Sequence, residues 1–129
     1  MSYEGYEEHC PIRQLIEIIS DKWVAAIIYT LAVGPERPGQ LQRKLPGLTK
    51  KMMTQTLRNL ESYGLVDRTV FDVVPPHVEY SLTREGVVFT ELLGLMCEWS
   101  TEQRELINTV TERKHQFRKL IRKPTRDLA

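Results

Sequence analysis

Basic and amide side chains recur at helical spacing on one side of residues 48–64. At about 100° per residue, one face carries Lys51, Gln55, Arg58 and Ser62, with Lys50 and Thr54 on its flanks. The opposite side carries Met53, Leu57 and Leu60, spaced by four and then three, and is apolar. Lysine and arginine bind phosphate oxygens, and amide and guanidinium groups can read the edges of base pairs. The segment therefore predicts an amphipathic helix with one buried side and one side free for an anionic ligand.

Two cysteines, Cys10 and Cys97, are the second set of residues with reactive side chains. Cys10 follows Glu7, Glu8 and His9 and precedes an expected helix. The two glutamates disfavour a thiolate there, whereas the helix N-terminus and a protonated His9 favour it, so the balance stays open. Cys97 lies in an apolar helical stripe, where a packed core residue and a sensor thiol are both compatible with the pattern. A structural disulfide is not expected in a cytosolic chain.

The sequence contains few of the motifs that would indicate an enzyme. The three histidines, His9, His77 and His115, are far apart along the chain. There is no His-Glu-x-x-His or Cys-x-x-Cys motif, no glycine-rich phosphate loop and no nucleophile elbow. The cysteines and histidines also lack the spacing of metal ligands. We therefore expect no catalytic residues, no cofactor and no metal site.

Length and composition are those of one globular domain, expected over residues 1–129. The chain is 41% apolar and 27% charged, and no segment has a disordered composition. No run approaches the roughly 18 uncharged apolar residues that a membrane span needs. The N-terminus is acidic and lacks the apolar region of a signal peptide. We expect a cytoplasmic protein with no membrane partner.

The net charge of +1 conceals four segregated blocks. Residues 1–36 carry two Lys/Arg against six Asp/Glu, and residues 37–68 carry seven against two. Residues 69–112 carry two against eight, and residues 113–129 carry seven against one. A basic middle block can hold a polyanion locally while the acidic blocks face elsewhere. A randomly mixed, solvated surface is the alternative.

Two apolar helices are expected before residue 36. The first covers residues 11–20 and has Pro11 in its first turn, where proline is favoured. Its apolar face is formed by Ile12, Leu15, Ile16 and Ile19. The second covers residues 22–34, can be capped by Asp21, and is apolar on most sides. Such a helix belongs in the middle of a core.

A helix-turn-helix unit is expected over residues 38–64. Its short first helix covers residues 38–45, with Leu41 and Leu45 inward and Gln40, Arg43 and Lys44 outward. Pro46-Gly47 ends this helix, Thr49 is suited to cap the next one, and Gly64 is suited to end it. Two helices joined by a short turn, the second more basic, form the unit that places its second helix in the DNA major groove.

A β-hairpin is expected to follow over residues 66–83. Residues 66–74 are rich in Val, Thr and Phe, and Val78 and Tyr80 alternate with polar neighbours over residues 77–82. Pro75 and Pro76 cannot lie inside a central strand, so they and His77 are expected at the hairpin tip. A hairpin beside the recognition helix is the wing of a winged helix. The expected fold class is therefore mainly α (α+β), a winged helix-turn-helix.

Residues 84–120 repeat apolar residues at helical spacing. The stripe consists of Val88, Leu92, Leu95, Trp99, Leu106 and Val110, widened by Val87, Met96 and Ile107. A single helix of this length would span roughly 55 Å at 1.5 Å per residue, too long to bury its stripe on so small a domain. Either it breaks near Ser100-Thr101, or it packs against a second copy, and both can hold. The expected dimer interface comprises Ile12, Leu15, Leu92, Leu95, Trp99, Leu106 and Val110. The alternative is that these residues serve the core of one chain.

Several segments occur together in the order and spacing of one family. They are Cys10-Pro11, Asp21-Lys22-Trp23, LPGLTKKMMTQTLRNLESYGLVDR, VVPPHVEYSLTREG and Cys97-Glu98-Trp99. With them the chain resembles the HxlR-type transcriptional regulators, winged helix-turn-helix proteins of bacteria and archaea related to the MarR-like regulators. The resemblance covers residues 10–99. It implies a homodimer with one wing per subunit and an interface formed by the N- and C-terminal helices, here about residues 11–20 and 84–120.

Two features depart from the family pattern. Asp21 stands where glycine is usual before Lys22-Trp23, which we expect to change only a turn. The basic tail after Glu112 lies beyond the resemblance. It is either a solvated helix end or an extra phosphate contact.

The expected function is that of a transcriptional regulator that binds double-stranded DNA. Two recognition helices would enter successive major grooves of a roughly palindromic operator. The expected contacts are Lys51, Gln55 and Arg58 to base edges, Lys50, Thr54, Arg43 and Lys44 to phosphates, and Arg68 and His77 to the backbone or minor groove. For Arg68 a structural salt bridge is an equal alternative. Repression and activation are not distinguished.

The resemblance also suggests that an oxidant or electrophile controls DNA binding. Some members of the resembled family sense oxidants or electrophiles through an N-terminal cysteine, and Cys10 stands at that place. On oxidation, Cys10 of one subunit would meet Cys97 of the other; inert thiols or a small-molecule effector are alternatives. A winged helix that binds proteins without specific DNA binding is the competing class. The basic face disfavours it, because protein interfaces are depleted in lysine.

Overall fold

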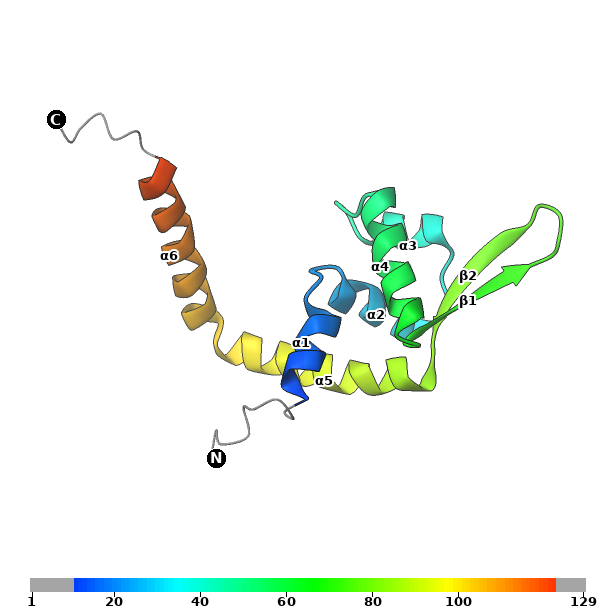
Figure 1. Cartoon of the computed structure of the whole chain (residues 1–129), viewed down its shortest axis with the longest axis horizontal. Coiled ribbons are helices and arrows are strands. Elements are labelled where there is room, and N and C mark those ends of the chain that lie inside the picture. Colours follow the sequence, from blue (N-terminus) through cyan, green and yellow to red (C-terminus); the bar gives the residue numbers. More distant parts are fainter. Residues whose placement is uncertain (1–10, 123–129) are drawn as a thin grey trace. The chain divides into compact units, whose positions relative to one another are not determined.

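The computed structural model describes residues 11–122 of the 129-residue chain. The elements are α1 (Ile12–Ile19), α2 (Val24–Val33), α3 (Pro38–Lys44), α4 (Lys50–Ser62), β1 (Val66–Phe71), β2 (His77–Leu82), α5 (Arg84–Glu102) and α6 (Arg104–Arg122) (Figure 1). This confirms the mainly α, winged helix-turn-helix class. The chain divides into two compact units between residues 92 and 93, inside α5. Its assignment to one domain stays a prediction.

Helix α2 lies in the centre of the first unit's core. Val24, Ile27 and Ile28 are fully buried on it, and Leu31 is nearly so. Buried residues of the neighbouring elements complete this core, among them Leu41, Leu57, Leu60 and Val66. The expectation from its all-round apolar sequence is confirmed. It begins at Val24, two residues later than expected, because Asp21 accepts a hydrogen bond from the backbone N–H of Trp23 (2.8 Å) and shapes a turn ahead of the helix.

Helix α4 begins and ends as its sequence predicts. Thr49 Oγ1 accepts a hydrogen bond from the N–H of Met52 (3.1 Å), which satisfies one of the free donors of the first turn. At the other end Gly64 has a φ of +72°, and the N–H of Leu65 donates to the carbonyl of Leu60 (3.0 Å). This is the hydrogen-bond pattern of a glycine-terminated helix. The two ends therefore fix the helix in length and register.

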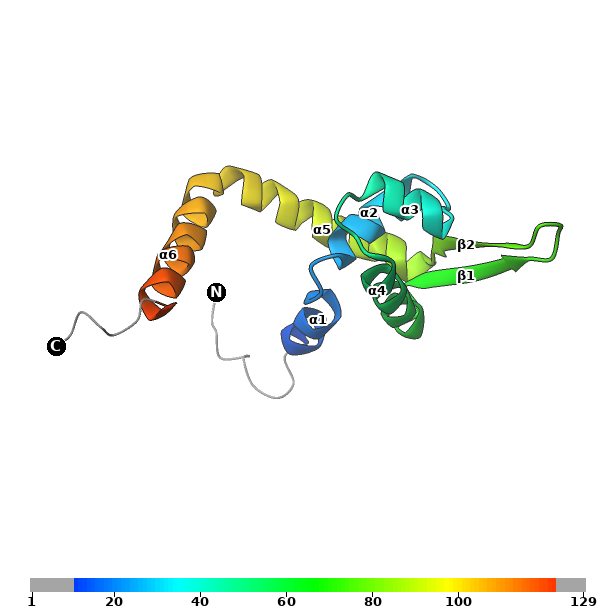
Figure 2. The ribbon, with the colours of Figure 1, turned by 90° about the horizontal axis from the view of Figure 1, so that it is seen from above.

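The first strand of the hairpin is shorter than expected, and His77 is not at the hairpin tip. Strands β1 and β2 are antiparallel, with Val66 opposite Leu82 and Phe71 opposite His77. The first strand was expected to reach Val74 but ends at Phe71, because His77 starts β2 and its ring stacks on that of Phe71 (centroids 4.7 Å apart). Residues 72–76 form the tip (Figure 2). The placement of His77 at the tip was wrong.

Glu36 pairs with Tyr80 of β2, on the side of β2 that faces away from β1. Its N–H donates to the carbonyl of Tyr80 (3.0 Å) and the N–H of Tyr80 donates back (2.8 Å). The chain just before α3 is thereby attached to β2. This ties the wing to the helix-turn-helix unit.

The apolar segment after Thr83 breaks into two helices, as one of the sequence alternatives predicts. The break lies at Gln103, slightly later than Ser100-Thr101. Thr101 does not cap a new helix because its hydroxyl donates back to the carbonyl of Cys97 (2.9 Å). Instead the carbonyl of Gln103 accepts the first hydrogen bond of α6, from Ile107 (3.0 Å). The chain changes direction there (Figures 1 and 2).

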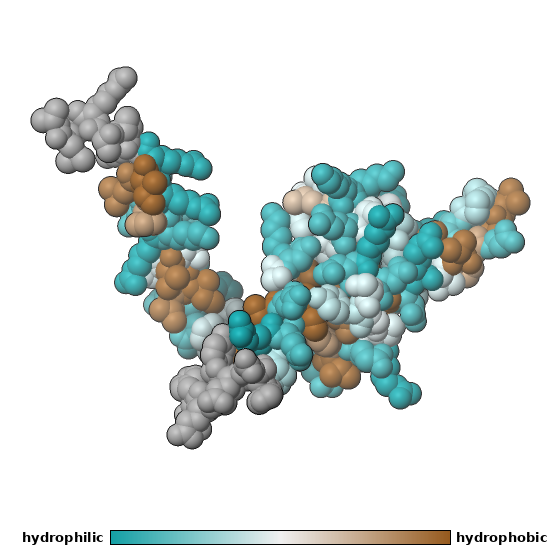
Figure 3. Space-filling model, viewed as in Figure 1, coloured by the Kyte–Doolittle hydropathy of each residue, from teal (hydrophilic) through white to brown (hydrophobic). Residues whose placement is uncertain are grey.

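Large apolar side chains remain exposed on α5 and α6. Those expected at a dimer interface are Leu95, Trp99, Leu106 and Val110, each more than half exposed. Phe117, Leu120 and Ile121 extend the set along α6, where Figure 3 shows apolar side chains gathered. On the first unit Ile12 is exposed, whereas Leu15 and Leu92 are half-buried. Within residues 11–122 every helix is too short or too polar to cross a lipid bilayer.

Candidate nucleic-acid interface

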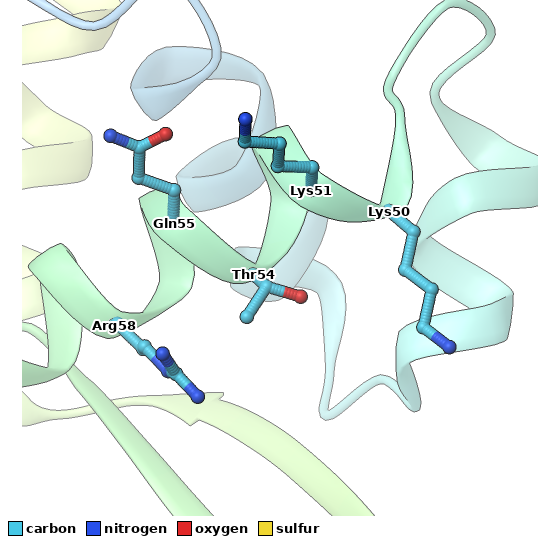
Figure 4. Close-up of a pocket in the computed structure, with 5 residues that line it drawn as sticks. All are labelled: Lys50, Lys51, Thr54, Gln55 and Arg58. Carbon is cyan, nitrogen blue, oxygen red and sulfur yellow. The ribbon is translucent and has the colours of Figure 1, made fainter.

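Five of the nine side chains expected to bind DNA line one hollow on the surface of α4. They are Lys50, Lys51, Thr54, Gln55 and Arg58. Figure 4 shows Lys51 and Gln55 projecting to one side of the helix and Lys50 and Arg58 to the other, with Thr54 between them. Within residues 11–122 none of these side chains forms a hydrogen bond or ion pair with the protein. Their donors are available to a ligand.

The opposite side of α4 holds this face in place. Met53, Leu57 and Leu60 are almost fully buried, so the helix cannot rotate without exposing them to water. Burying such side chains stabilises a fold by about 1.5–3 kcal/mol each. This packing therefore keeps the polar face of α4 on the surface.

The first turn of α4 is electrostatically suited to an anion. It carries Lys50 and Lys51 and no acidic residue. Positive charge at a helix N-terminus opposes the helix dipole, whereas a bound phosphate would interact favourably with the dipole and both ammonium groups. A phosphate contact would thus offset the repulsion between the two lysines and the positive end of the helix dipole.

The two basic residues at the end of α3 have partners inside the protein. Arg43 is exposed, and its Nε donates to the carbonyl of Gly39 (3.3 Å). The Lys44 ammonium forms an ion pair with the carboxylate of Glu36, a residue only 5% exposed. Lys44 therefore has a structural task that its sequence position did not reveal. Glu36 follows a Gly-Pro turn with no periodicity that would mark it as buried.

In the wing, Arg68 lies exposed on β1 opposite Tyr80. Both ion pairs found within residues 11–122 involve other residues, so the salt bridge considered for Arg68 does not form there. The half-buried ring of His77 has its Nε2 atom 3.3 Å from Arg37 Nη2 and 3.4 Å from Glu79 Oε2. Arg37 is thus a cation beside the wing that the sequence reasoning missed. The pairing of Glu36 with Tyr80 brings the neighbouring Arg37 close to β2.

Of the two cysteines in the thiol hypothesis, Cys97 lies among the described residues. Cys97 is a free, exposed thiol, so packing in the core of this chain does not account for it. Cys10 lies outside the described residues. Its pairing with Cys97 stays a prediction.

Comparison with known proteins decides the family. The family described as HxlR-like helix-turn-helix matches residues 18–108, well over half of the chain. The chain belongs to this family. The matched residues include every side chain discussed for α3, α4 and the wing, whereas Cys10 and the last part of α6 lie outside.

Individual known proteins are similar to this chain in sequence and in fold. An uncharacterised HTH-type transcriptional regulator of Bacillus subtilis (strain 168), YkvN, is 42% identical over 90 residues, which cover 70% of this chain and 76% of YkvN. The redox regulator HypR in its reduced form superposes with a TM-score of 0.72 at 34% identity, covering 78% of this chain and 99% of HypR. The reduced form of the transcriptional regulator YodB from B. subtilis gives a TM-score of 0.67 at 28% identity, covering 73% and 92%. This HxlR-like chain is a transcriptional regulator of the helix-turn-helix type.

Proposed function

We propose that this HxlR-like regulator binds double-stranded DNA as a homodimer and reads a roughly palindromic operator. The observation that carries the proposal is the α4 face, where five polar side chains line one hollow and lack protein partners within residues 11–122. A helix of this kind, following a short helix and a turn, fits the major groove. Two such helices related by a twofold axis would contact half-sites about one helical turn apart.

The side chains divide by the chemistry that each offers. Arg58 can donate two hydrogen bonds to guanine, Gln55 can pair with adenine, and Lys51 can reach base acceptors. Lys50 and Thr54 suit phosphate oxygens, as does the exposed Arg43. Lys44 would contribute less, because its ammonium already pairs with Glu36. The first three residues would determine the sequence preference, and the others would anchor the protein.

The wing would add backbone or minor-groove contacts. Arg68 is exposed on β1 and free of ion pairs within residues 11–122. His77 begins β2, and Arg37, at the N-terminus of α3, lies beside it. An arginine beside the recognition helix can reach the narrow minor groove next to the half-site.

Self-association is supported by the apolar residues that a single chain leaves in water. Leu95 and Trp99 on α5, and Leu106 and Val110 on α6, are all more than half exposed. Exposed apolar surface of this extent is typical of an interaction site. A second copy of this chain is the partner that a palindromic operator requires.

A thiol response forms a further part of the proposal. HypR is named a redox regulator and has been solved in reduced and oxidised forms, and YodB in reduced and diamide-treated forms. In this chain Cys97 is exposed. A peroxide would accept two electrons and two protons from Cys10 of one subunit and Cys97 of the other, leaving one S–S bond. No catalytic turnover of a substrate is part of this function, and the expected site of action is the cytoplasm.

The test is binding of the wild-type protein to the region upstream of its own gene, compared with an unrelated duplex of equal length. Fluorescence anisotropy at several salt concentrations should show tighter binding to the upstream region and weaker binding as salt rises. Footprinting should show two protected half-sites about one turn apart. Absence of binding to any duplex at low salt, with a protein partner recovered by pull-down, would instead favour a protein-interaction module.

A further inference from the structure

Asp21, in the turn before α2, contacts the recognition helix α4. Asp21 Oδ2 accepts a hydrogen bond from Thr56 Oγ1 at 2.7 Å, across 35 residues of sequence. Its other oxygen, Oδ1, accepts from the backbone N–H of Trp23 at 2.8 Å. One carboxylate therefore joins the turn before α2 to the middle of α4.

Thr56 is a buried polar residue on the inward side of α4. It is 1% exposed, among the apolar residues Met53, Leu57 and Leu60. A buried hydroxyl needs a hydrogen-bond partner, and a threonine inside a helix commonly donates back to its own helix. Here the hydroxyl donates to Asp21 instead, in a charge-assisted bond of the stronger kind. The bond fixes the rotation of α4 at the residue next to Gln55 and two residues before Arg58.

The same turn also touches the start of the recognition helix. The ring of Trp23 lies against Gly47, where an added Cβ would stand 3.7 Å from its outermost carbon. Gly47 has a φ of +92° and belongs to the turn that leads to Thr49, the cap of α4. Because Asp21 holds the backbone of Trp23, it supports α4 at its beginning as well as at Thr56.

We propose that Asp21 and Thr56 form a positioning pair that sets the sequence specificity of DNA binding without contacting DNA. The pair holds α4 in the one rotation in which Gln55 and Arg58 reach base edges. A residue without a side-chain acceptor at position 21 would leave the Thr56 hydroxyl without this partner. The inference rests on the proposed function, since it concerns how the side chains of the α4 face are oriented toward DNA.

Loss of the Asp21–Thr56 bond should weaken binding to the operator more than binding to unrelated DNA. When only part of the population holds the binding-competent rotation, the apparent dissociation constant rises in inverse proportion to that fraction. For Thr56→Val and Asp21→Ala we expect operator binding to weaken roughly three- to tenfold. Binding to unrelated DNA, which depends on phosphate contacts, should change much less. The salt slope should stay at the wild-type value because no phosphate contact is lost.

The experiment measures the affinity of each variant for the upstream duplex and for an unrelated duplex, together with its thermal stability. Thr56→Ser keeps the hydroxyl and should restore the wild-type ratio of the two affinities. Thr30→Val is the matched control, because Thr30 donates only to Ala26 of its own helix (2.8 Å). It should alter stability without altering the ratio. The double variant Asp21→Ala/Thr56→Val should bind no more weakly than the single variant that binds more weakly, since each single variant already removes the hydrogen bond between Asp21 and Thr56.

Three results would overturn the inference. Thr56→Val could retain the wild-type affinity ratio while folding normally, or the losses of the two single variants could add in the double variant. Thr30→Val could reduce the ratio as much as Thr56→Val, which would assign the effect to general destabilisation. If the wild-type protein bound no DNA, the proposed function would fail first and the inference with it.

Discussion

Gly86, in the first turn of α5, packs directly on the backbone carbonyl of Leu65, so that a Cβ at this position would overlap the carbonyl oxygen. The surrounding hydrogen bonds keep the two segments together. Thr83 donates through its N–H to the carbonyl of Leu65 (3.1 Å) and through its hydroxyl to that of Gly64 (2.6 Å). The end of α4, the start of β1 and the start of α5 therefore meet where only glycine fits.

Gly86→Ala should destabilise the fold by about 1–3 kcal/mol, as overpacking does. A backbone carbonyl cannot swing aside as a flexible side chain can. Thermal unfolding followed by circular dichroism would measure the change. Gly39→Ala in α3 is the control: nothing lies within 4 Å of its added Cβ, and alanine favours a helix, so the melting temperature should hold or rise. Equal melting temperatures for Gly86→Ala and wild type would contradict the packing described.

Lys44→Ala should lower stability by about 1–3 kcal/mol, because it leaves the buried carboxylate of Glu36 without its partner. Lys50→Ala removes the same charge from an exposed residue that lacks a protein partner within residues 11–122, and should leave stability nearly unchanged. Urea unfolding of the two variants gives the comparison. Equal losses would show that the Lys44–Glu36 pair does not stabilise the fold.

Leu106→Glu should weaken self-association. Leu106 is half exposed on α6, and burying a leucine contributes about 1.5–3 kcal/mol per copy, so the dimer dissociation constant should rise at least roughly tenfold. Sedimentation velocity would measure it. Asn108→Glu adds the same charge to another exposed position of the same helix and should leave the dimer intact. An unchanged dimer in Leu106→Glu would remove this face from the interface.

Mild peroxide should produce a covalent dimer on non-reducing gels if Cys10 and Cys97 pair between subunits. The band should disappear in both Cys10→Ser and Cys97→Ser and after treatment with a thiol reductant. Since Cys97 is exposed, its reaction does not require unfolding. A band that persisted in Cys10→Ser would refute the pairing between these two residues.

Features fixed by nearby residues could be predicted from the sequence. The cap at Thr49, the glycine end at Gly64 and the apolar side of α4 all depend on residues within a few positions, and each was confirmed. The five side chains lining the α4 hollow were identified for the same reason, since helical periodicity alone places them on one face. That they bind DNA stays a prediction.

Features that depend on distant residues could not be predicted. His77 was placed at the hairpin tip from the neighbouring prolines, but its pairing and stacking with Phe71 decided its position. The Lys44–Glu36 pair and the Asp21–Thr56 hydrogen bond likewise depend on how the elements pack. Asp21 was expected to alter only a turn, and no local pattern indicates that it reaches α4.

The most direct test of the account is the salt dependence of operator binding by α4 variants. Arg58→Ala should cost about 1–3 kcal/mol on the upstream duplex and reduce the preference over unrelated DNA. Lys50→Ala should weaken binding to both duplexes and lower the salt slope by about one, and Lys51→Ala should also weaken operator binding. Arg104→Ala on α6, which removes one charge outside α4, should change neither quantity. If Arg58→Ala and Lys51→Ala kept the wild-type affinity and salt slope, the α4 face would not be the DNA-reading surface.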